Sequence, residues 1–190
     1  MIYLSHINTA CTTSTEVIDD CHYPQRVHWF PETYARAKTG LSYPPHVLAN
    51  MVLKQETIEV IKEKPAKSAF ILAAGSQCWD NVNTKPPYKE SDRLKYSCKI
   101  PFIYLSNIYA GRVAGMFGPM EYVATDASAC ASSIKVLMDV QNLMRNYGFD
   151  RVIVLGVEDA VNNSTLDFFG QAKASLLLKD EDAIKPSAFD

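Results

Sequence analysis

The spacing of apolar residues along the chain predicts helices that alternate with buried strands. Between Val47 and Ile61, apolar residues return every three or four positions, which predicts one amphipathic helix that ends before Pro65. Residues 69–73 are a short apolar run followed by Ala-Gly-Ser, a pattern typical of a buried strand that leads into a turn. A fully apolar strand is buried on both faces, so this run favours a parallel sheet covered by helices.

The same alternation continues through the C-terminal half of the chain. Strands are predicted over residues 121–126 and 151–157, the second of them buried, with a long helix over 131–147 between them. Residues 102–117 predict a further helix, and helical spacing returns weakly over 166–178. Three glycines are expected to shorten or interrupt the helix at 102–117: Gly111, Gly115 and Gly118. Strands that alternate with helices predict an α/β layered domain.

The N-terminal part of the chain carries weaker signals. Residues 2–10 have the composition of a strand, and Thr13 and Glu16 stand at capping-box spacing, which predicts a short helix after that strand. Residues 81–99 are polar, charged and contain prolines, so we expect a surface excursion there rather than a domain boundary. We therefore expect residues 1–190 to form one domain, since 190 residues are too few for two ordinary ones.

Composition and charge narrow the functional classes. With 19 basic and 21 acidic residues the formal net charge is -2, so no overall field attracts nucleic acid or an anionic membrane. The five cysteines are odd in number and scattered, which suggests neither a disulfide framework nor a zinc site. The N-terminus lacks a basic stretch, and the apolar run at 152–157 is far too short for a membrane span. We therefore expect a cytoplasmic protein that binds neither nucleic acid nor membranes.

The candidate chemistry lies in residues 125–133, where small residues lead from a predicted strand into a predicted helix, with Cys130 at the junction. Free N–H groups and the positive dipole end at a helix start stabilise a thiolate, which is the nucleophilic form of cysteine. Ala129, Ala131 and Ser132 leave room for a substrate carbonyl, and the amide of Cys130 can face a developing oxyanion. The pattern alone also fits a plain structural role, because a free cysteine flanked by alanines usually packs as a small buried hydrophobe.

Three motifs place this cysteine in a wider pattern. They are NIYAGR at residues 107–112, ACASS at 129–133 and GFDRVIVLGVE at 148–158. Together they resemble the N-terminal half of β-ketoacyl synthases, the condensing enzymes of fatty acid and polyketide assembly. The resemblance runs from about Pro101 to the C-terminus, where residues 186–190 look like a Pro-Phe-Asp segment that lies near the middle of a full-length ketosynthase.

The resemblance implies a fold and a chemistry. The fold is the N-terminal half of the thiolase-like αβαβα arrangement, with a mixed, mostly parallel sheet packed between helices. Cys130 would be the acyl-accepting thiol, with its own amide as one oxyanion-hole donor. The substrate would arrive on the phosphopantetheine of an acyl carrier protein, and neither a bound cofactor nor a metal is implied.

The resemblance also implies that part of the catalytic machinery belongs to a second half of the fold. Two histidines and a lysine of that half support decarboxylation and condensation in the family. The histidines of this chain all precede Cys130, lie in segments without family motifs and are expected on the surface or in loops: His6, His22, His28 and His46. We therefore do not expect the chain to carry out a full reaction alone, and we expect an apolar face that a partner covers.

Two explanations fit a chain of half the family's length. In the first, the chain is a natural short subunit that resembles the chain-length factors of type II polyketide and aryl-polyene systems. It would pair as a heterodimer with a full-length ketosynthase. The resemblance then places Ile100, Tyr104 and Ile108, a stripe at helical spacing, at the floor of the acyl tunnel, where side-chain bulk limits product length. Plain core packing explains that spacing equally well.

In the second explanation the chain is the N-terminal fragment of an active β-ketoacyl synthase. The retained Cys130 favours it, because chain-length factors commonly carry glutamine at the matching position. The start at Met1 without a tag scar favours the natural subunit, which is our preferred interpretation. A further hypothesis, from another functional class, is a purely structural interaction module, which predicts no acylation at Cys130.

Overall fold

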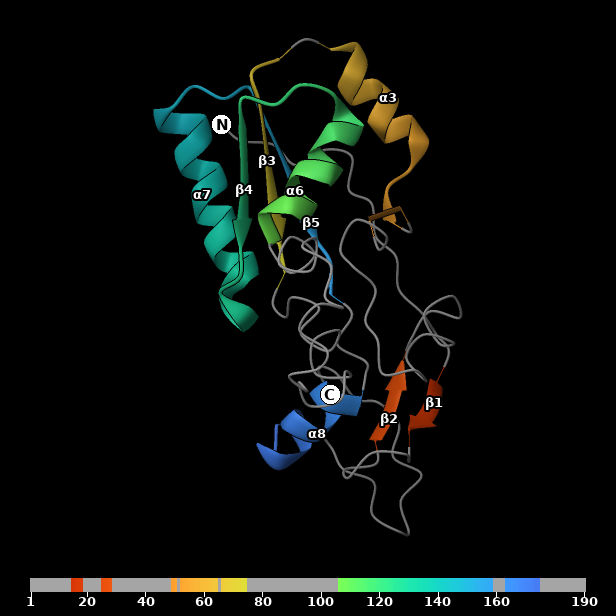
Figure 1. The fold of residues 1–190 in the computed structure, drawn as a ribbon. Coiled ribbons are helices and arrows are strands. Elements are labelled where there is room, and N and C mark those ends of the chain that lie inside the picture. The colour runs from red at the N-terminus through yellow and green to blue at the C-terminus, as the bar shows by residue number, and fades with distance from the viewer. Residues whose placement is uncertain are drawn as a thin grey trace, which may run out of the picture. The chain divides into compact units, whose positions relative to one another are not determined.

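A computed structural model of the chain (Figure 1) describes residues 15–18, 25–28, 49–50, 52–64, 66–74, 106–158 and 163–174. Contacts within the chain form two compact units. The first unit contains α3 (Gln55–Glu63), β3 (Ser68–Ala73), α6 (Ser106–Ala114), the 3-10 turn η2 (Gly115–Phe117), β4 (Tyr122–Asp126), the 3-10 turn η3 (Ala129–Ala131), α7 (Ser132–Asn146) and β5 (Arg151–Gly156). The second contains β1 (Thr15–Ile18), β2 (Gln25–His28) and α8 (Asn163–Gln171).

The first unit is built on a three-stranded parallel sheet in the order β4-β3-β5. In the central strand all six residues are buried, and the register pairs Ile71 with Ala124 on one side and with Val154 on the other. A strand that consists almost entirely of apolar side chains is stable only where both faces are covered, which is why the apolar run at 69–73 takes the central place. The structure therefore confirms the predicted α/β class, with a parallel sheet among helices.

Helices of the first unit cover both faces of this sheet (Figure 1). On one face, a buried cluster joins β3 to the apolar side of α7: Ala69, Ile71, Ala73, Val136 and Leu143. On the other face, the rings of Phe70 and Phe117 lie 6.0 Å apart between centroids, which brings β3 against η2 and the end of α6. Alternate residues of one strand point to opposite faces, so β3 supplies the core on both sides.

Polar contacts align the strands where they begin. The guanidinium of Arg151 donates to Ser68 Oγ from Nε (3.1 Å) and from Nη2 (2.8 Å), and Nη1 donates to the carbonyl oxygen of Ile61 (2.9 Å). The amide of Ser68 donates to Glu121 Oε2 at 2.7 Å. These bonds satisfy buried polar groups and tie the starts of β3 and β5 to α3. The amino-terminal edge of the sheet is therefore held by its own side chains.

Glycines follow two helical segments of the first unit. The α-helix α6 stops at Ala114 and continues as the single turn η2, after which Gly118 has a φ of 97°. After α7, Gly148 has a φ of 65°. Residues with a side chain rarely adopt these φ values, so glycine is the residue type that suits both turns.

The predicted helix over Val47–Ile61 is wrong as a single element. Residues 49–50 and 52 are helical, but Lys54 is extended, with a φ of -84° and a ψ of 137°, and α3 starts afresh at Gln55. The apolar spacing passes through this break unchanged. Periodicity reports which side chains face the core, and two short helices in sequence can meet the same requirement as one long helix.

In the second unit, the prediction of a short helix near Glu16 is wrong. Residues 15–18 form the strand β1, which pairs antiparallel with β2, where the capping-box spacing of Thr13 and Glu16 had predicted a short helix. Thr15, Val17 and Ile18 are β-branched residue types, which favour strands once a pairing partner is available. The helix α8 begins and ends earlier than the predicted range 166–178.

Several expectations fall on residues outside the described ranges. The predicted strand at 2–10, the surface excursion at 81–99 and the family-like segment at 186–190 are among them. The single domain over residues 1–190 therefore stays a prediction. Within the described part of the chain, none of the helices has the length and apolarity that a membrane crossing needs.

The burial of the central strand predicts which side chains of the sheet contribute most to the free energy of unfolding. Ile71→Ala is expected to lower the free energy of unfolding by about 2–5 kcal/mol, because Ile71 is 2% exposed and its removal leaves a cavity under α7. Its register partner Val154 is 42% exposed, so Val154→Ala is the matched control, with an expected loss below about 1 kcal/mol. Urea unfolding of both variants measures the difference, and equal losses would contradict the central place of β3.

Candidate active site

Cys130 lies at the carboxyl edge of the parallel sheet. The strand β4 ends at Asp126, residues 127 and 128 lead away from the sheet, and Cys130 is the middle residue of η3, directly before α7. The amide of Ala74 donates to the carbonyl oxygen of Asp126 at 3.0 Å, so β3 and β4 end side by side here. The structure thus places the cysteine at the strand-to-helix junction expected from its small neighbours.

The thiol of Cys130 is free and its residue is exposed. This exposure removes the interpretation of Cys130 as a small buried hydrophobe. No side chain caps the start of α7, because the N-cap residue is Ala131. The amides of Ala131 and Ser132 donate to carbonyl oxygens of the preceding turn, so what this position offers a negative charge is the positive end of the helix dipole.

The backbone next to Cys130 forms a closed turn with one residue in a strained conformation. Ala129 has a φ of 51°, in the left-handed region that residues with a side chain rarely adopt. The amide of Ala131 donates to the carbonyl oxygen of Ser128 at 3.1 Å, which closes the turn. A left-handed alanine costs about 1–2 kcal/mol, so the turn needs contacts that hold it.

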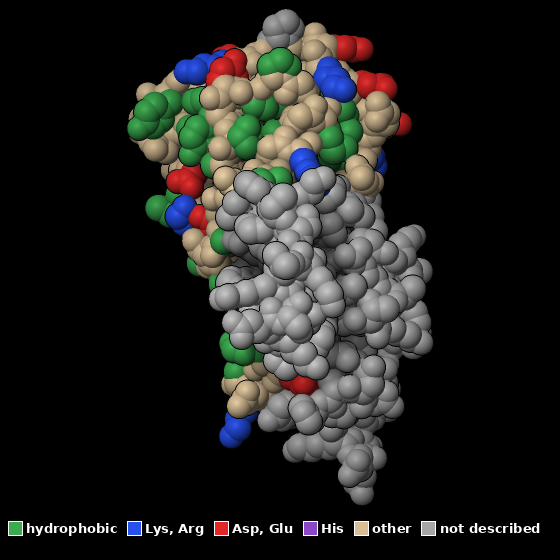
Figure 2. All heavy atoms as spheres, viewed as in Figure 1, with side chains coloured by type: hydrophobic (Ala, Val, Ile, Leu, Met, Phe, Trp, Pro, Cys, Tyr) green, Lys and Arg blue, Asp and Glu red, His purple; other side chains and the backbone are tan. Residues whose placement is uncertain are grey.

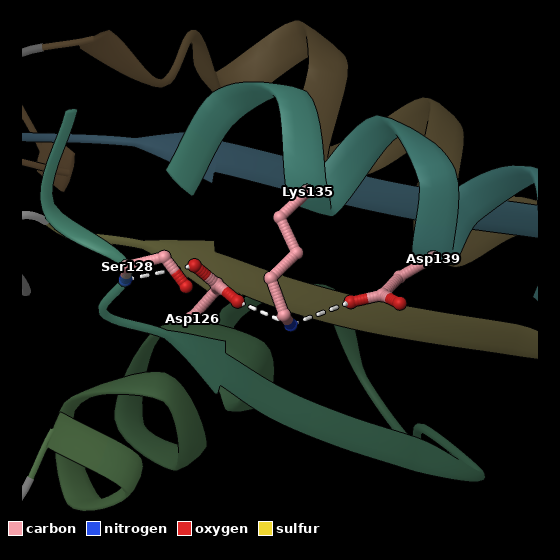
Figure 3. A network of polar contacts seen from close by, with 4 residues as sticks. All are labelled: Asp126, Ser128, Lys135 and Asp139. Carbon is pink, nitrogen blue, oxygen red and sulfur yellow. Dashed lines mark hydrogen bonds and ion pairs between the residues drawn. The ribbon is translucent and has the colours of Figure 1, made fainter. Parts of the chain in front are cut away.

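Those contacts come from Asp126, whose carboxylate is buried beneath the turn (Figure 3). Oδ1 accepts a hydrogen bond from the amide of Ser128 at 3.0 Å. Oδ2 forms an ion pair with Nζ of Lys135, which lies in the first turn of α7. Nζ also contacts Oδ2 of Asp139 at 3.3 Å, one helical turn further on. Asp126 therefore connects the end of β4, the turn and the start of α7.

These contacts decide the charge of the buried carboxylate. Burial by itself raises the pKa of Asp126, but hydrogen bonds from Lys135 and from the amide and hydroxyl of Ser128, with the positive charge of Lys135, outweigh burial and lower the pKa to about 2. Hydrogen bonds to Asp126 and Asp139 raise the pKa of Lys135. At neutral pH both groups are charged, and the link between β4 and α7 is an ion pair.

The start of α7 also holds a buried hydroxyl. Ser132 is 5% exposed, and among the described residues its Oγ has no hydrogen-bond partner. Sequence reasoning used Ser132 only as a small residue that leaves space, and it gave Asp126 and Lys135 no role. The one available signal was an acidic residue at the end of a predicted strand, followed by a lysine in the first turn of the next predicted helix.

The other predicted site residues are only partly placed. Ile100 and Tyr104 lie outside the described residues, and Ile108 is half-buried in α6, so their place in an acyl tunnel stays a prediction. His28 belongs to β2 of the second unit, and the other three histidines lie outside the described ranges. Where side chains are described, His, Cys, Asp and Glu do not gather into groups of three that could hold a metal ion.

A comparison with protein families places the chain in one of them. The family model described as Beta-ketoacyl synthase, N-terminal domain, matches residues 47–190. The match includes all the described elements of the first unit, with Asp126, Cys130 and Lys135. No curated protein and no solved structure matches the chain.

The ionised Asp126 predicts how stability changes in acid. Because its pKa in the folded protein lies below the ordinary value of 3.8, the charged carboxylate stabilises the fold above about pH 4, and this contribution is lost as the pH falls towards about 2. Asp126→Asn keeps an acceptor for Ser128 but loses the charge. Its deficit in unfolding free energy should be largest near pH 6 and shrink towards about pH 2.

Chemical unfolding of wild type and Asp126→Asn at a series of pH values measures this deficit. Asp139→Asn is the matched control, because Asp139 contacts the same lysine from an exposed position. A deficit that stays constant between about pH 6 and pH 2 would show that the charge of Asp126 does not contribute.

Proposed function

Because the chain belongs to the β-ketoacyl synthase family through this N-terminal domain, we propose that it serves acyl-chain elongation and that Cys130 accepts the acyl group. The observation that carries the proposal is the exposed position of Cys130 in η3, between a strand of the parallel sheet and an uncapped helix start. A nucleophile needs exposure to meet its substrate, and a thiolate needs nearby positive potential. Cys130 has the exposure, and the positive end of the α7 dipole follows it directly in the chain.

The proposed step is a transfer of an acyl group between two sulfur atoms. The thiolate of Cys130 attacks the carbonyl carbon of an acyl thioester carried on the phosphopantetheine of an acyl carrier protein. The carbonyl oxygen becomes an oxyanion, which the amide of Cys130 and the start of α7 stabilise. The bond between the carbonyl carbon and the carrier sulfur then breaks, the carrier thiolate takes up a proton from water, and the acyl group remains on Cys130 as a thioester.

Carbon–carbon bond formation requires further groups. In the proposed reaction a malonyl extender loses carbon dioxide, and its carbanion attacks the thioester on Cys130 and releases the cysteine thiolate. Histidine is the usual general acid or base near neutral pH, and in the β-ketoacyl synthases that this chain resembles, two histidines and a lysine of a second half support this step. We therefore assign the acyl-accepting half of the reaction to this chain and the condensing half to groups from another domain or subunit.

A second candidate is the role of a chain-length factor, which pairs with a full-length ketosynthase and shapes its acyl tunnel. Ile134, Leu137 and Met138 on α7 are 67%, 56% and 65% exposed and form an apolar stripe at the spacing of helical neighbours. Hydrophobic side chains also gather on the face of the first unit shown in Figure 2. Exposed apolar surface of this kind supports contact with another protein or domain. In this role Ile100, Tyr104 and Ile108 would limit the length of the product.

Acyl transfer to the protein tests the first candidate. Incubation with an acyl carrier protein loaded with a medium-length acyl chain is expected to add one acyl group, seen as a mass increase that hydroxylamine reverses. Cys130→Ala should lose this modification because the accepting sulfur is gone, whereas the matched control Cys98→Ala should keep it. Folded wild-type protein that takes up no acyl group, or Cys130→Ala protein that takes it up fully, would contradict the proposal.

Pairing tests the second candidate. Co-expression with a full-length β-ketoacyl synthase from the same genome should give a heterodimer by size exclusion and mass analysis. Leu137→Asp is expected to weaken the pairing by about 30-fold or more, because it places a charge in the apolar stripe. Asn142→Asp, on the same helix, is the charge-matched control and should pair normally. A chain that stays monomeric beside its partner would contradict this role.

A further inference from the structure

The Asp126–Lys135 ion pair (Figure 3) joins the two ends of the chain segment that contains Cys130, the candidate nucleophile. Asp126 is the last residue of β4, and Lys135 lies in the first turn of α7. All of η3, with Cys130 at its centre, lies between these two residues in the chain. The ion pair therefore fixes the distance between the two ends of the segment that carries the thiol.

The segment needs such a constraint for two reasons. Ala129 holds a left-handed φ of 51°, which the alanine side chain disfavours, and a free loop would relax from it. The start of α7 has Ala131 as its N-cap and receives no side-chain hydrogen bond there, so capping does not fix where the helix begins. The Asp126 carboxylate meets both needs, because it holds the amide of Ser128 (3.0 Å) with one oxygen and the helix lysine with the other.

We propose that Asp126 and Lys135 are positioning residues that hold the Cys130 thiol against the start of α7. The inference rests on the proposed function, since a role for Cys130 in acyl transfer gives its position a purpose. Burial of a charged carboxylate costs desolvation energy, and the lysine that pairs with it is 53% exposed, so a gain in stability alone does not account for a carboxylate at 5% exposure. A fixed geometry at the nucleophile does account for it.

The rate of Cys130 alkylation reports this position. The thiol is exposed already, so a looser turn gains little access, and the rate depends on how well the helix start stabilises the thiolate. Pulses of iodoacetamide at pH 7, resolved by peptide mass spectrometry, give the rate for Cys130 and, in the same sample, for the other four cysteines. Thermal unfolding of each variant shows that labelling is measured on folded protein.

Lys135→Met should slow the labelling of Cys130 by about threefold and leave the other cysteines unchanged, because the helix start then stabilises the thiolate less well. Lys135→Arg keeps the ion pair and should restore the rate to within about 1.5-fold of wild type. Asp139→Asn is the control, because it removes the exposed partner of the same lysine and does not touch the turn. It should label at the wild-type rate.

Lys135→Met leaves a buried charge unpaired, so a second variant is needed if that protein unfolds. The double variant Asp126→Asn with Lys135→Met removes both charges and should show the same slower labelling. Wild-type labelling rates in either folded variant, or an equal slowing in Asp139→Asn, would overturn the positioning role. Slower labelling without any acyl transfer in wild type would overturn the proposed function and leave the positioning role standing.

Discussion

The carboxylate of Asp126 is the contact on which the geometry of the candidate site depends. It is the last side chain of β4, it is buried, and it holds the following turn through the amide of Ser128 and the next helix through Lys135. Without it, the chain between the end of β4 and the start of α7 is a turn that contains a left-handed alanine. The contacts of Asp126 thus hold the turn that carries Cys130 in a fixed place relative to the end of β4.

The two edges of the sheet differ in what holds them. At the amino-terminal edge, Arg151 binds Ser68 and the end of α3, so polar groups there are used for alignment. At the carboxyl edge, the chain of β4 continues into an exposed turn that carries Cys130. Ligands of parallel α/β sheets bind at the carboxyl ends of the strands, where helix starts also gather. Cys130 therefore lies at the edge where such sheets bind their ligands.

The parts of the fold that could be predicted are those with a local physical cause. The apolar run at 69–73 requires burial on both sides, and it forms the buried central strand β3. The run at 152–157 forms β5 in the predicted place, but the prediction of a buried strand there is wrong, because β5 lies at the edge of the described sheet and Leu155 is its one buried residue. The junction that carries Cys130 could be predicted because small residues between a strand and a helix are a local pattern. The break before α3 and the pairing of β1 with β2 depend on contacts with other segments, which periodicity does not report. The roles of Asp126 and Lys135 could not be predicted, because a salt bridge across a turn leaves no repeat in the sequence.

Hydrogen–deuterium exchange at the amides of residues 127–132 measures the constraint at the Cys130 turn most directly. In the wild type the amide of Ser128 donates to a charged, buried carboxylate, so its exchange should be slow. Asp126→Ala should speed this exchange by about tenfold or more and leave the amides of β5 unchanged. Equal exchange at Ser128 in wild type and Asp126→Ala would contradict the claim that Asp126 holds the turn.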